Sequence, residues 1–248
     1  STPKPSSAAS DVYKRQDENI LLVDKPVGMV VHEDESGDSD TLINRIKSYL
    51  YHKGEYHPEN ELSFAPALCN RIDRNTCGIV IAAKNAESLR ILNQKIRDRE
   101  LTKLYLCIAC GKVTPDSATL TAYLEKNSDT NTVKISDKKT KSNLTIKTKY
   151  KVIAYNGENS LLKVDLLTGR THQIRAHLAY IGHALLGDGK YGNNKLNKKY
   201  GFKYQALCSY ELQFKFTTDA GCLSYLDGKC FKAKAPDFVK MFGSNIKL

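Results

Sequence analysis

Two polar stretches of this sequence hold side chains that can do chemistry at places where an apolar core is expected. The first, Arg71-Ile-Asp73-Arg74-Asn75-Thr76, comes just before a short apolar run typical of a buried strand. Neighbouring arginines bias an aspartate toward its charged form. A charged Asp73 suits a nucleophile or an electrostatic stabiliser, and not a general acid. The competing interpretation is a structural ion pair at the end of a strand.

The second stretch, Thr168-Gly-Arg170-Thr-His172-Gln173-Ile-Arg175, leads into a predicted helix. Arg175 falls on the first turn of that helix, where backbone N–H groups and a guanidinium can both meet anions. For this stretch too, an ion pair that only stabilises the helix end is a simpler alternative when the stretch is taken by itself.

The sequence lacks the usual signatures of cofactor and metal binding. No G-x-G-x-x-G follows a strand, and no G-x-x-x-x-G-K-[ST] occurs. The six histidines are scattered, and His172 and His177 are about 500° apart around a helix, so they do not share a face. Cys107-Ile-Ala-Cys110 lies in a predicted strand, where residues three apart point to opposite sides. We therefore expect no metal and no cofactor, and catalysis by side chains alone.

Composition points to a globular protein with an anionic partner. The 248 residues include 38 Lys and Arg against 27 Asp and Glu, a formal charge of +11, with 41% hydrophobic and 26% charged residues. An excess of positive charge favours nucleic acid as partner, although a basic enzyme without such a partner fits as well. No stretch has the length and apolarity of a membrane span. The seven cysteines and the lack of a secretory signal favour a reduced, cytoplasmic location.

Residues 1–16 are rich in Ser, Ala and Pro and predict an unstructured leader. Residues 11–16 also resemble the translation of an adapter used in sequencing libraries, so we treat the leader as non-native. Ordered patterns start at Asp17, and we expect a single catalytic domain over 17–248.

The first half of that domain shows alternating strand and helix signals. Short apolar runs predict strands at 20–23, 29–32, 79–82 and 104–109. Apolar residues recurring every three or four positions predict helices at 41–51 and 86–97. Asn85 is the expected cap of the second helix, and Leu89, Leu92 and Ile96 its core face.

The second half is more basic. Residues 134–151 contain seven Lys and one Asp, and their alternation predicts exposed strands, although a merely solvated face explains the charge equally well. Further strands are expected at 161–167, 205–216 and 223–233, a basic loop at 187–203, and a terminal helix at 237–242. The helix over 172–181 should be capped by Thr171 and end at Gly182. Paired strands mixed with helices indicate an α+β fold with a mixed sheet.

Five motifs in order resemble the RluA-type family of pseudouridine synthases. The match covers about residues 17–240, and the ordered set is far more specific than any one motif. The motifs are Lys25-Pro26-x-Gly28-Met29-x-x-His32, Arg71-Ile-Asp73-x-x-Thr76-x-Gly78, Lys103-x-Tyr105, Gly169-Arg-Thr-His-Gln-Ile-Arg175-x-His177 and Gly187-Asp188-x-x-Tyr191-Gly192.

The resemblance implies isomerisation of a uridine in RNA to its C-glycoside, without cofactor or metal. Asp73 matches the essential aspartate, which acts on the flipped-out nucleotide by direct attack or by a glycal route. Tyr105 matches the tyrosine that stacks on the base, and Arg175 the arginine that pairs with the aspartate. Arg71 matches a residue thought to take the place of the base. The expected substrate-binding residues are Arg71, Thr76, Arg170, His172, Gln173 and Leu207.

The same resemblance implies a largely antiparallel sheet with flanking helices, in two subdomains around a central cleft, and a monomer. Ribosomal RNA of the large subunit is the first expected substrate, and transfer RNA the second. Flipping the uridine costs a few kcal/mol. Basic segments can hold flanking phosphates, and about five such contacts would lower log K by about 3 to 4 per decade of salt.

The sequence departs from the family pattern at three positions, where Asn70, Cys77 and Cys208 replace a usual His, Ser and His. None is the expected nucleophile, so the departures bear on substrate detail and not on the chemistry. The small N-terminal RNA-binding module of many relatives is not recognisable, and the leader leaves open that it was cut away. A non-catalytic RNA-binding protein on the same fold is the rival interpretation, but such a protein would be expected to lose Asp73, Tyr105 or Arg175.

Overall fold

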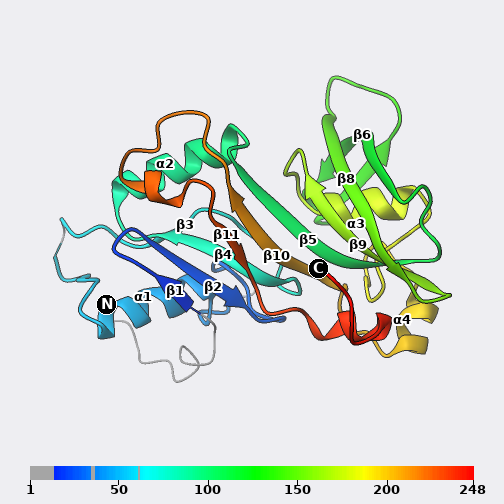
Figure 1. The fold of residues 1–248 in the computed structure, drawn as a ribbon, viewed down its shortest axis with the longest axis horizontal. Coiled ribbons are helices and arrows are strands. Elements are labelled where there is room, and N and C mark those ends of the chain that lie inside the picture. The colour runs from blue at the N-terminus through cyan, green and yellow to red at the C-terminus, as the bar shows by residue number, and fades with distance from the viewer. Residues whose placement is uncertain (1–13, 35–36, 61) are drawn as a thin grey trace. The chain divides into compact units, whose positions relative to one another are not determined.

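The computed structural model describes residues 14–34, 37–60 and 62–248 and consists of two compact units (Figure 1). Unit 1 comprises Ser1–Thr102 and Glu211–Lys234, and unit 2 comprises Lys103–Tyr210 and Ala235–Leu248. The chain passes from one unit to the other within β5 (Leu101–Cys110), within β10 (Leu207–Phe214) and after residue 234. Both units combine antiparallel strands with helices, which confirms the predicted α+β class.

The sheet of unit 1 is built on two apolar strands that the sequence predicts. β2 (Ile20–Lys25) pairs with β4 (Cys77–Ala83) from Ile20↔Ala83 to Lys25↔Gly78. The short β1 (Lys14–Gln16) adds to β2, β3 (Ala67–Leu68) to β4, and β11 (Cys230–Lys232) to the end of β10. Lys14–Gln16, which the sequence analysis places in the expected leader over 1–16, thus form a strand, and residues 1–13 lie outside the described part of the chain.

Helix α1 (Leu42–His52) covers one face of this sheet, as its apolar spacing predicts. Thr41 caps the helix, its side chain accepting the N–H of Asn44 at 3.3 Å. Leu42, Ile46 and Leu50 pack with residues of β2 and β4 in one buried cluster.

The strand predicted over 29–32 is wrong. The carbonyls of Val30 and Val31 accept the N–H groups of Leu42 and Ile43 at 2.9 and 3.1 Å, so this segment is used to hold the start of α1. Its backbone acceptors are therefore not available for a ladder with another strand.

Helix α2 (Ala86–Arg97) has the predicted bounds and the predicted cap, Asn85, which accepts the N–H of Ser88 at 2.9 Å. Its buried face differs from the prediction, because Ser88, Ile91 and Lys95 are buried beside Leu92, while Leu89 and Ile96 are only half-buried. The buried face of α2 is rotated from the predicted one because Lys95 belongs to a polar network at the end of the helix.

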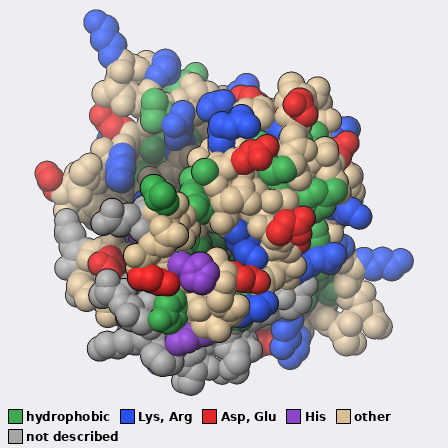
Figure 2. Space-filling view, turned by 90° about the vertical axis from the view of Figure 1, so that its left-hand side faces the viewer, with side chains coloured by type: hydrophobic (Ala, Val, Ile, Leu, Met, Phe, Trp, Pro, Cys, Tyr) green, Lys and Arg blue, Asp and Glu red, His purple; other side chains and the backbone are tan. Residues whose placement is uncertain are grey.

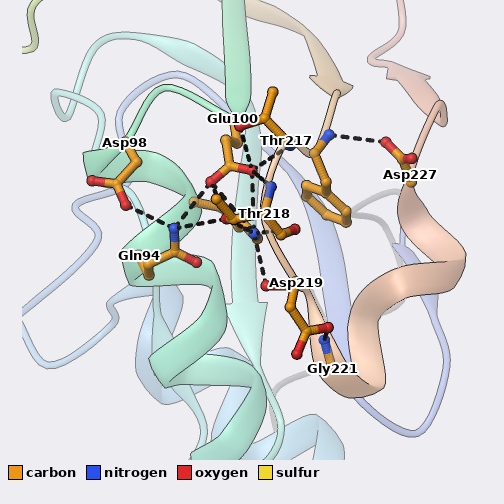
Figure 3. A network of polar contacts seen from close by, with 10 residues as sticks. Gln94, Asp98, Glu100, Thr217, Thr218, Asp219, Gly221 and Asp227 are labelled. Carbon is orange, nitrogen blue, oxygen red and sulfur yellow. Dashed lines mark hydrogen bonds and ion pairs between the residues drawn. The ribbon is translucent and has the colours of Figure 1, made fainter.

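Figure 3 shows Glu100 of that network among Gln94, Thr217 and Thr218. The fully buried ammonium of Lys95 lies 3.2 Å from a carboxylate oxygen of Glu100. Lys95 also donates to the carbonyls of Thr218 and Asp219, both at 2.9 Å. Although burial opposes it, hydrogen bonds from Thr217, Thr218 and Gln94 hold the pKa of Glu100 well below its ordinary value. The network ties α2 to the start of β5 and to the segment between β10 and the 3₁₀ helix η2 (Gly221–Leu226).

The sheet of unit 2 has the strand order β5-β9-β8-β6-β7, and every pairing in it is antiparallel. The bounds are β6 Ser117–Asn127, β7 Thr132–Ser136, β8 Leu144–Tyr155 and β9 Asn159–Leu166. Helix α3 (Gln173–Tyr180) packs on one face of the sheet, where Ile174 and Leu178 join a buried cluster with Tyr150 and Leu162 (Figure 1).

Several local predictions in the second half need correction. Helix α4 (Asn194–Tyr200) lies in the predicted basic loop, capped by Asn193. The cap position of α3 is His172 and not Thr171, and its side chain makes no capping hydrogen bond. Residues 223–233, predicted as a strand, divide between η2 and β11, and the terminal helix is the 3₁₀ helix η3 (Asp237–Phe242). No helix in the described residues is long and apolar enough to cross a bilayer.

Candidate active-site residues

Asp73 lies in a tight turn that leads into β4. The N–H of Thr76 donates to the Asp73 carbonyl at 3.0 Å, and the N–H of Gly28 donates to the Arg74 carbonyl at 2.8 Å. The turn is therefore fixed both by its own hydrogen bond and by the segment that follows β2. Asp73 itself is half-buried.

Lys25 connects these two segments through its side chain. Its ammonium, on a side chain that is 1% exposed, donates to the carbonyls of Pro26, Met29 and Arg74 at 2.8, 2.7 and 2.9 Å. Burial lowers the pKa of Lys25 to about 8, against the favourable charges of Cys77 and Asp73. At neutral pH all three hydrogens are present, and each one reaches a carbonyl oxygen.

The other predicted residues of unit 1 differ in exposure. Arg71 is exposed, and Thr76 is 2% exposed behind the turn. Burial and, after it, the positive charge of Arg71 lower the pKa of His32. A cationic side chain is thus presented to solvent two residues before the half-buried carboxylate.

In unit 2, Tyr105 and Leu207 belong to one buried cluster. Tyr105 lies on β5 opposite Val164 of β9 and is 6% exposed. Leu207, the first residue of β10, is equally buried and packs in the same cluster, together with Tyr150 and Ile174. Leu207, expected from the resemblance to bind substrate, thus shares a buried cluster with Tyr105.

Arg175 is held by a buried carboxylate that the sequence analysis does not single out. Its Nε and Nη2 donate to the two oxygens of Asp188 at 2.7 and 3.0 Å. Asp188 is fully buried and also accepts the N–H groups of Lys190 and Tyr191. Although burial raises it, the hydrogen bonds and the charge of Arg175 hold the pKa of Asp188 below its ordinary value. The guanidinium also lies over the ring of Tyr191, with Cζ 5.3 Å from its centroid.

Tyr191 extends this arrangement to β7 and to the loop before α3. Its hydroxyl accepts the N–H of Val133 at 3.0 Å and lies 2.8 Å from Nδ1 of His172. His172 has a φ of 53°, a left-handed conformation that non-glycine residues rarely adopt and that surrounding contacts must hold.

Gln173 uses its whole amide inside the protein. Its oxygen accepts the Thr168 hydroxyl at 2.9 Å and the Arg170 N–H at 3.1 Å, and its nitrogen donates to the Lys147 carbonyl and the Thr148 hydroxyl, both at 3.0 Å. Gln173 is 2% exposed, whereas the side chain of Arg170 is exposed. The amide therefore shapes the loop that presents Arg170.

The predicted residues divide between the units, with Arg71, Asp73 and Thr76 in unit 1 and the rest in unit 2. Asp188 and Tyr191, which the sequence analysis quotes in the fifth motif without assigning them a role, are contacts of Arg175 and His172 in the fold. The described part of the chain contains no group of three or more His, Cys, Asp or Glu side chains that could hold a metal ion.

A family model described as RNA pseudouridylate synthase matches residues 19–180. A Mycoplasma genitalium protein named as an uncharacterized RNA pseudouridine synthase is 37% identical over 80% of this chain and 62% of its own length. The ribosomal large subunit pseudouridine synthase D of Borreliella burgdorferi is 33% identical over 71% of this chain and 53% of its own length. The mitochondrial tRNA pseudouridine(32) synthase of Saccharomyces cerevisiae is 31% identical over 73% of this chain and 37% of its own length.

The chain thus spans about half to three fifths of the length of the bacterial relatives that it matches. Among solved structures, human RNA pseudouridylate synthase domain containing 4 has a TM-score of 0.73 at 19% identity, covering 94% of this chain and 92% of that one. Human RNA pseudouridylate synthase domain containing 1 has a TM-score of 0.69 at 20% identity, covering 94% and 86%. At these identities the likeness establishes the fold.

Proposed function

The chain belongs to the RluA-type family of RNA pseudouridine synthases, and we propose that it isomerises specific uridines in structured RNA to pseudouridine. The observation that carries this proposal is the match of the family model over residues 19–180, a range that includes Asp73, Tyr105 and Arg175. The arrangement around these residues supports the proposal, because the carboxylate lies on a braced turn and the guanidinium is fixed by a buried counterion.

The reaction breaks the bond between N1 of uracil and C1′ of ribose and forms a bond between C5 and C1′. The C5 proton is lost and N1 gains a proton, so the overall change is an isomerisation that needs neither oxidant nor group donor. In the direct route Asp73 attacks C1′, and in the glycal route it promotes loss of a ribose proton. Tyr105 is proposed to stack on the base and to move a proton, and Arg175 is the proposed source of positive charge in the reaction.

The contacts in the loop before α3 suggest different roles for its three predicted RNA-binding residues. Arg170 is exposed and is suited to contact a phosphate of the RNA. Gln173 acts as a positioning residue, because all of its hydrogen-bonding groups are used within the protein. His172 is held by Tyr191 and can use its other ring nitrogen toward the substrate.

Large-subunit ribosomal RNA is the proposed substrate, and transfer RNA is the second candidate. The names of two relatives carry this choice, since one acts on the ribosomal large subunit and the other on position 32 of tRNA. The greater share of its own length over which the ribosomal enzyme matches favours the first.

The test is to map pseudouridines in total RNA of a host strain that lacks its own enzymes, with and without this chain. We expect new sites with the wild type and none with Asp73→Asn, which keeps the size of the side chain and removes its negative charge. Asp129→Asn, in the exposed turn after β6, is the matched control and should give the wild-type sites.

The position of the new sites names the substrate. Sites in 23S RNA support the ribosomal assignment, and sites in tRNA alone replace it with the second candidate. If the wild type creates no new site, or if Asp73→Asn creates the same sites, the proposed activity is wrong and a non-catalytic RNA-binding role takes its place.

A further inference from the structure

A row of three lysines lies along the outer face of β8. Lys147, Lys149 and Lys151 are all exposed and alternate with the buried Thr148 and Tyr150, which face the side that α3 covers. Residues two apart on a strand are about 6.7 Å from each other, so the row extends about 13 Å. The structure therefore turns the basic stretch of the sequence into one regular line of positive charge.

A second row, of hydroxyl side chains, lies beside the lysines. Across the β6–β8 pairing, Thr121 is opposite Lys147, Thr119 is opposite Lys149 and Ser117 is opposite Lys151. All three are exposed. We call the two rows together the β8 lysine face, which comprises Ser117, Thr119, Thr121, Lys147, Lys149 and Lys151.

Folding alone gives no reason for this arrangement. No described carboxylate forms an ion pair with the three lysines within 4.0 Å, and on β9 Lys163 lies directly opposite Lys151. Like charges directly opposite each other destabilise a sheet. The acidic residues on this side are Asp165, opposite Lys149, and Glu125, which accepts the Ser142 hydroxyl at 2.9 Å.

The face of the molecule in Figure 2 carries charges of both signs. On the face shown in Figure 2, Lys and Arg side chains stand at several separate places with acidic side chains between them. The β8 lysine face instead combines adjacent cations with hydroxyl groups. Lys, Ser and Thr side chains are among the groups that donate hydrogen bonds to phosphates and sugars in nucleic-acid complexes.

We propose that the β8 lysine face docks the backbone of a double-helical arm of the RNA substrate. The inference rests on the proposed function insofar as the partner is RNA. A duplex fits better than a single strand, because single strands are bound by stacking their bases on aromatic rings. The neighbouring aromatic residue on β6, Tyr123, has the ammonium of Lys139 5.9 Å from its ring centroid. Hydroxyl and ammonium groups match the 2′-hydroxyls and phosphates by which duplex RNA is recognised.

The docked arm is separate from the segment that carries the target uridine. Tyr105 lies opposite Val164, which lies opposite Tyr150, so these three residues share the face covered by α3. Lys149 lies opposite Asp165, which lies opposite Leu104, so the lysines are on the other face of the same sheet. An RNA that uses both faces must therefore extend around the sheet.

The first test measures binding of the full chain to a 20-base-pair RNA hairpin without uridine, by fluorescence anisotropy at several salt concentrations. The variant K147Q/K149Q/K151Q removes the three charges, and K215Q/K229Q/K247Q removes three exposed charges elsewhere as the control. If about three phosphate contacts are lost, the slope of log K against log salt becomes shallower by about 2 to 3. We expect affinity at 0.1 M salt to fall about 10- to 100-fold, and the control to bind like the wild type.

The outcomes separate this proposal from its alternatives. Equal losses in both variants would show general attraction, and a larger loss on single-stranded poly(U) than on the hairpin would show a single-strand site; either result overturns the proposal. A salt-dependence slope that is the same for the triple variant and the wild type also overturns the proposal. So does a triple variant that binds the hairpin like the wild type and loses binding only to anionic vesicles. Because the hairpin contains no uridine, this test stands even if the chain makes no pseudouridine.

The second test uses turnover on large-subunit RNA transcripts. We expect the triple variant to raise KM about 10-fold with kcat unchanged on the full transcript, and to change neither constant on a minimal stem-loop with the target uridine. A fall in kcat on both RNAs would instead indicate damage to the face that carries Tyr105, and would contradict the proposal.

Discussion

Replacing Asp188 by Asn isolates what the buried counterion of Arg175 does. The carboxylate accepts four N–H groups, and one oxygen takes only the Nε–H of Arg175, at 2.7 Å, while the other takes the remaining three. The amide of Asn therefore keeps three of the four contacts if its NH₂ group replaces the first oxygen. That NH₂ then faces Nε–H, donor against donor, and the guanidinium loses its counterion.

The expected cost follows from burial. Arg175 is 7% exposed and Asp188 is fully buried, and removing one partner of a buried ion pair costs about 3 to 5 kcal/mol. Because most of the hydrogen bonds survive, we expect Asp188→Asn to lower the free energy of unfolding by about 3 kcal/mol, the lower end of that range. Urea denaturation at pH 7 measures it, with Asp129→Asn as the control that should match the wild type.

The same variant should impair catalysis beyond its effect on stability. Without the bidentate contact the guanidinium is no longer fixed, so we expect kcat to fall at least about 10-fold while KM changes little. Release of tritium from RNA labelled at C5 of uridine follows the reaction, since the C5 proton is lost. If Asp188→Asn loses less than 1 kcal/mol and keeps its kcat, Asp188 does not position Arg175 and the reasoning is refuted.

The pH dependence gives an independent check on the counterion. Because the folded-state pKa of Asp188 lies below its ordinary value of 3.8, its contribution to stability is complete well above that pH and is lost as the pH falls. The difference in unfolding free energy between the wild type and Asp188→Asn should therefore shrink below about pH 4. A difference that is the same at pH 7 and pH 3 would show that the charge of Asp188 contributes nothing.

Two further predictions concern other buried groups. Burial lowers the pKa of His177 to about 4 from 6.5, so its neutral form is favoured in the fold. In urea denaturation, lowering the pH from 7.5 to 5 should reduce the unfolding free energy of the wild type by about 2 kcal/mol more than that of His177→Gln. Equal reductions in the two proteins would contradict the effect of burial. Lys25→Met removes the ammonium that donates to the buried Met29 carbonyl and to the Arg74 carbonyl. We therefore expect an unfolding free energy about 2 kcal/mol lower and faster hydrogen exchange at the N–H groups of Thr76 and Gly28. Unchanged exchange would show that Lys25 does not hold the turn of Asp73.

Local signals in the sequence predict the elements well where one residue decides the outcome. Asn85 marks the start of α2, and the apolar runs at 20–23 and 79–82 identify the paired strands β2 and β4. The prediction over 29–32 was wrong because its backbone acceptors are used by α1, a contact between segments about ten residues apart. The apolar pattern describes side chains, and it carries no information on which backbone groups are already taken.

The buried face of α2 shows a second limit. Counting apolar residues favours Leu89 and Ile96, but the helix instead buries Lys95, whose charge is compensated by Glu100 and by the carbonyls of Thr218 and Asp219. Except for Glu100, these partners lie more than 100 residues further along the chain. A lysine at position 95 is therefore assigned to the surface by any rule that considers the helix alone.

The candidate site shows the same contrast. The resemblance of the five motifs gives the roles expected of Asp73, Tyr105 and Arg175, but the contacts that hold two of these residues are visible only in the fold. Lys25 braces the turn of Asp73 through three carbonyls, and Asp188 fixes Arg175 through two oxygens. In both cases a charge is buried at a cost in desolvation, and hydrogen bonds offset that cost only when every one is made.

This dependence gives a reason why charged side chains, and not apolar ones, hold the turn of Asp73 and the guanidinium of Arg175. An apolar residue at position 25 or 188 would pack without any directional requirement and would leave the turn or the guanidinium free to move. A buried ammonium or carboxylate is stable in only one arrangement of its partners, so it holds the neighbouring group in one orientation. Because electrostatic catalysis requires charges that are oriented before the substrate reacts, the roles proposed for Asp73 and Arg175 would account for the cost in stability of burying Lys25 and Asp188.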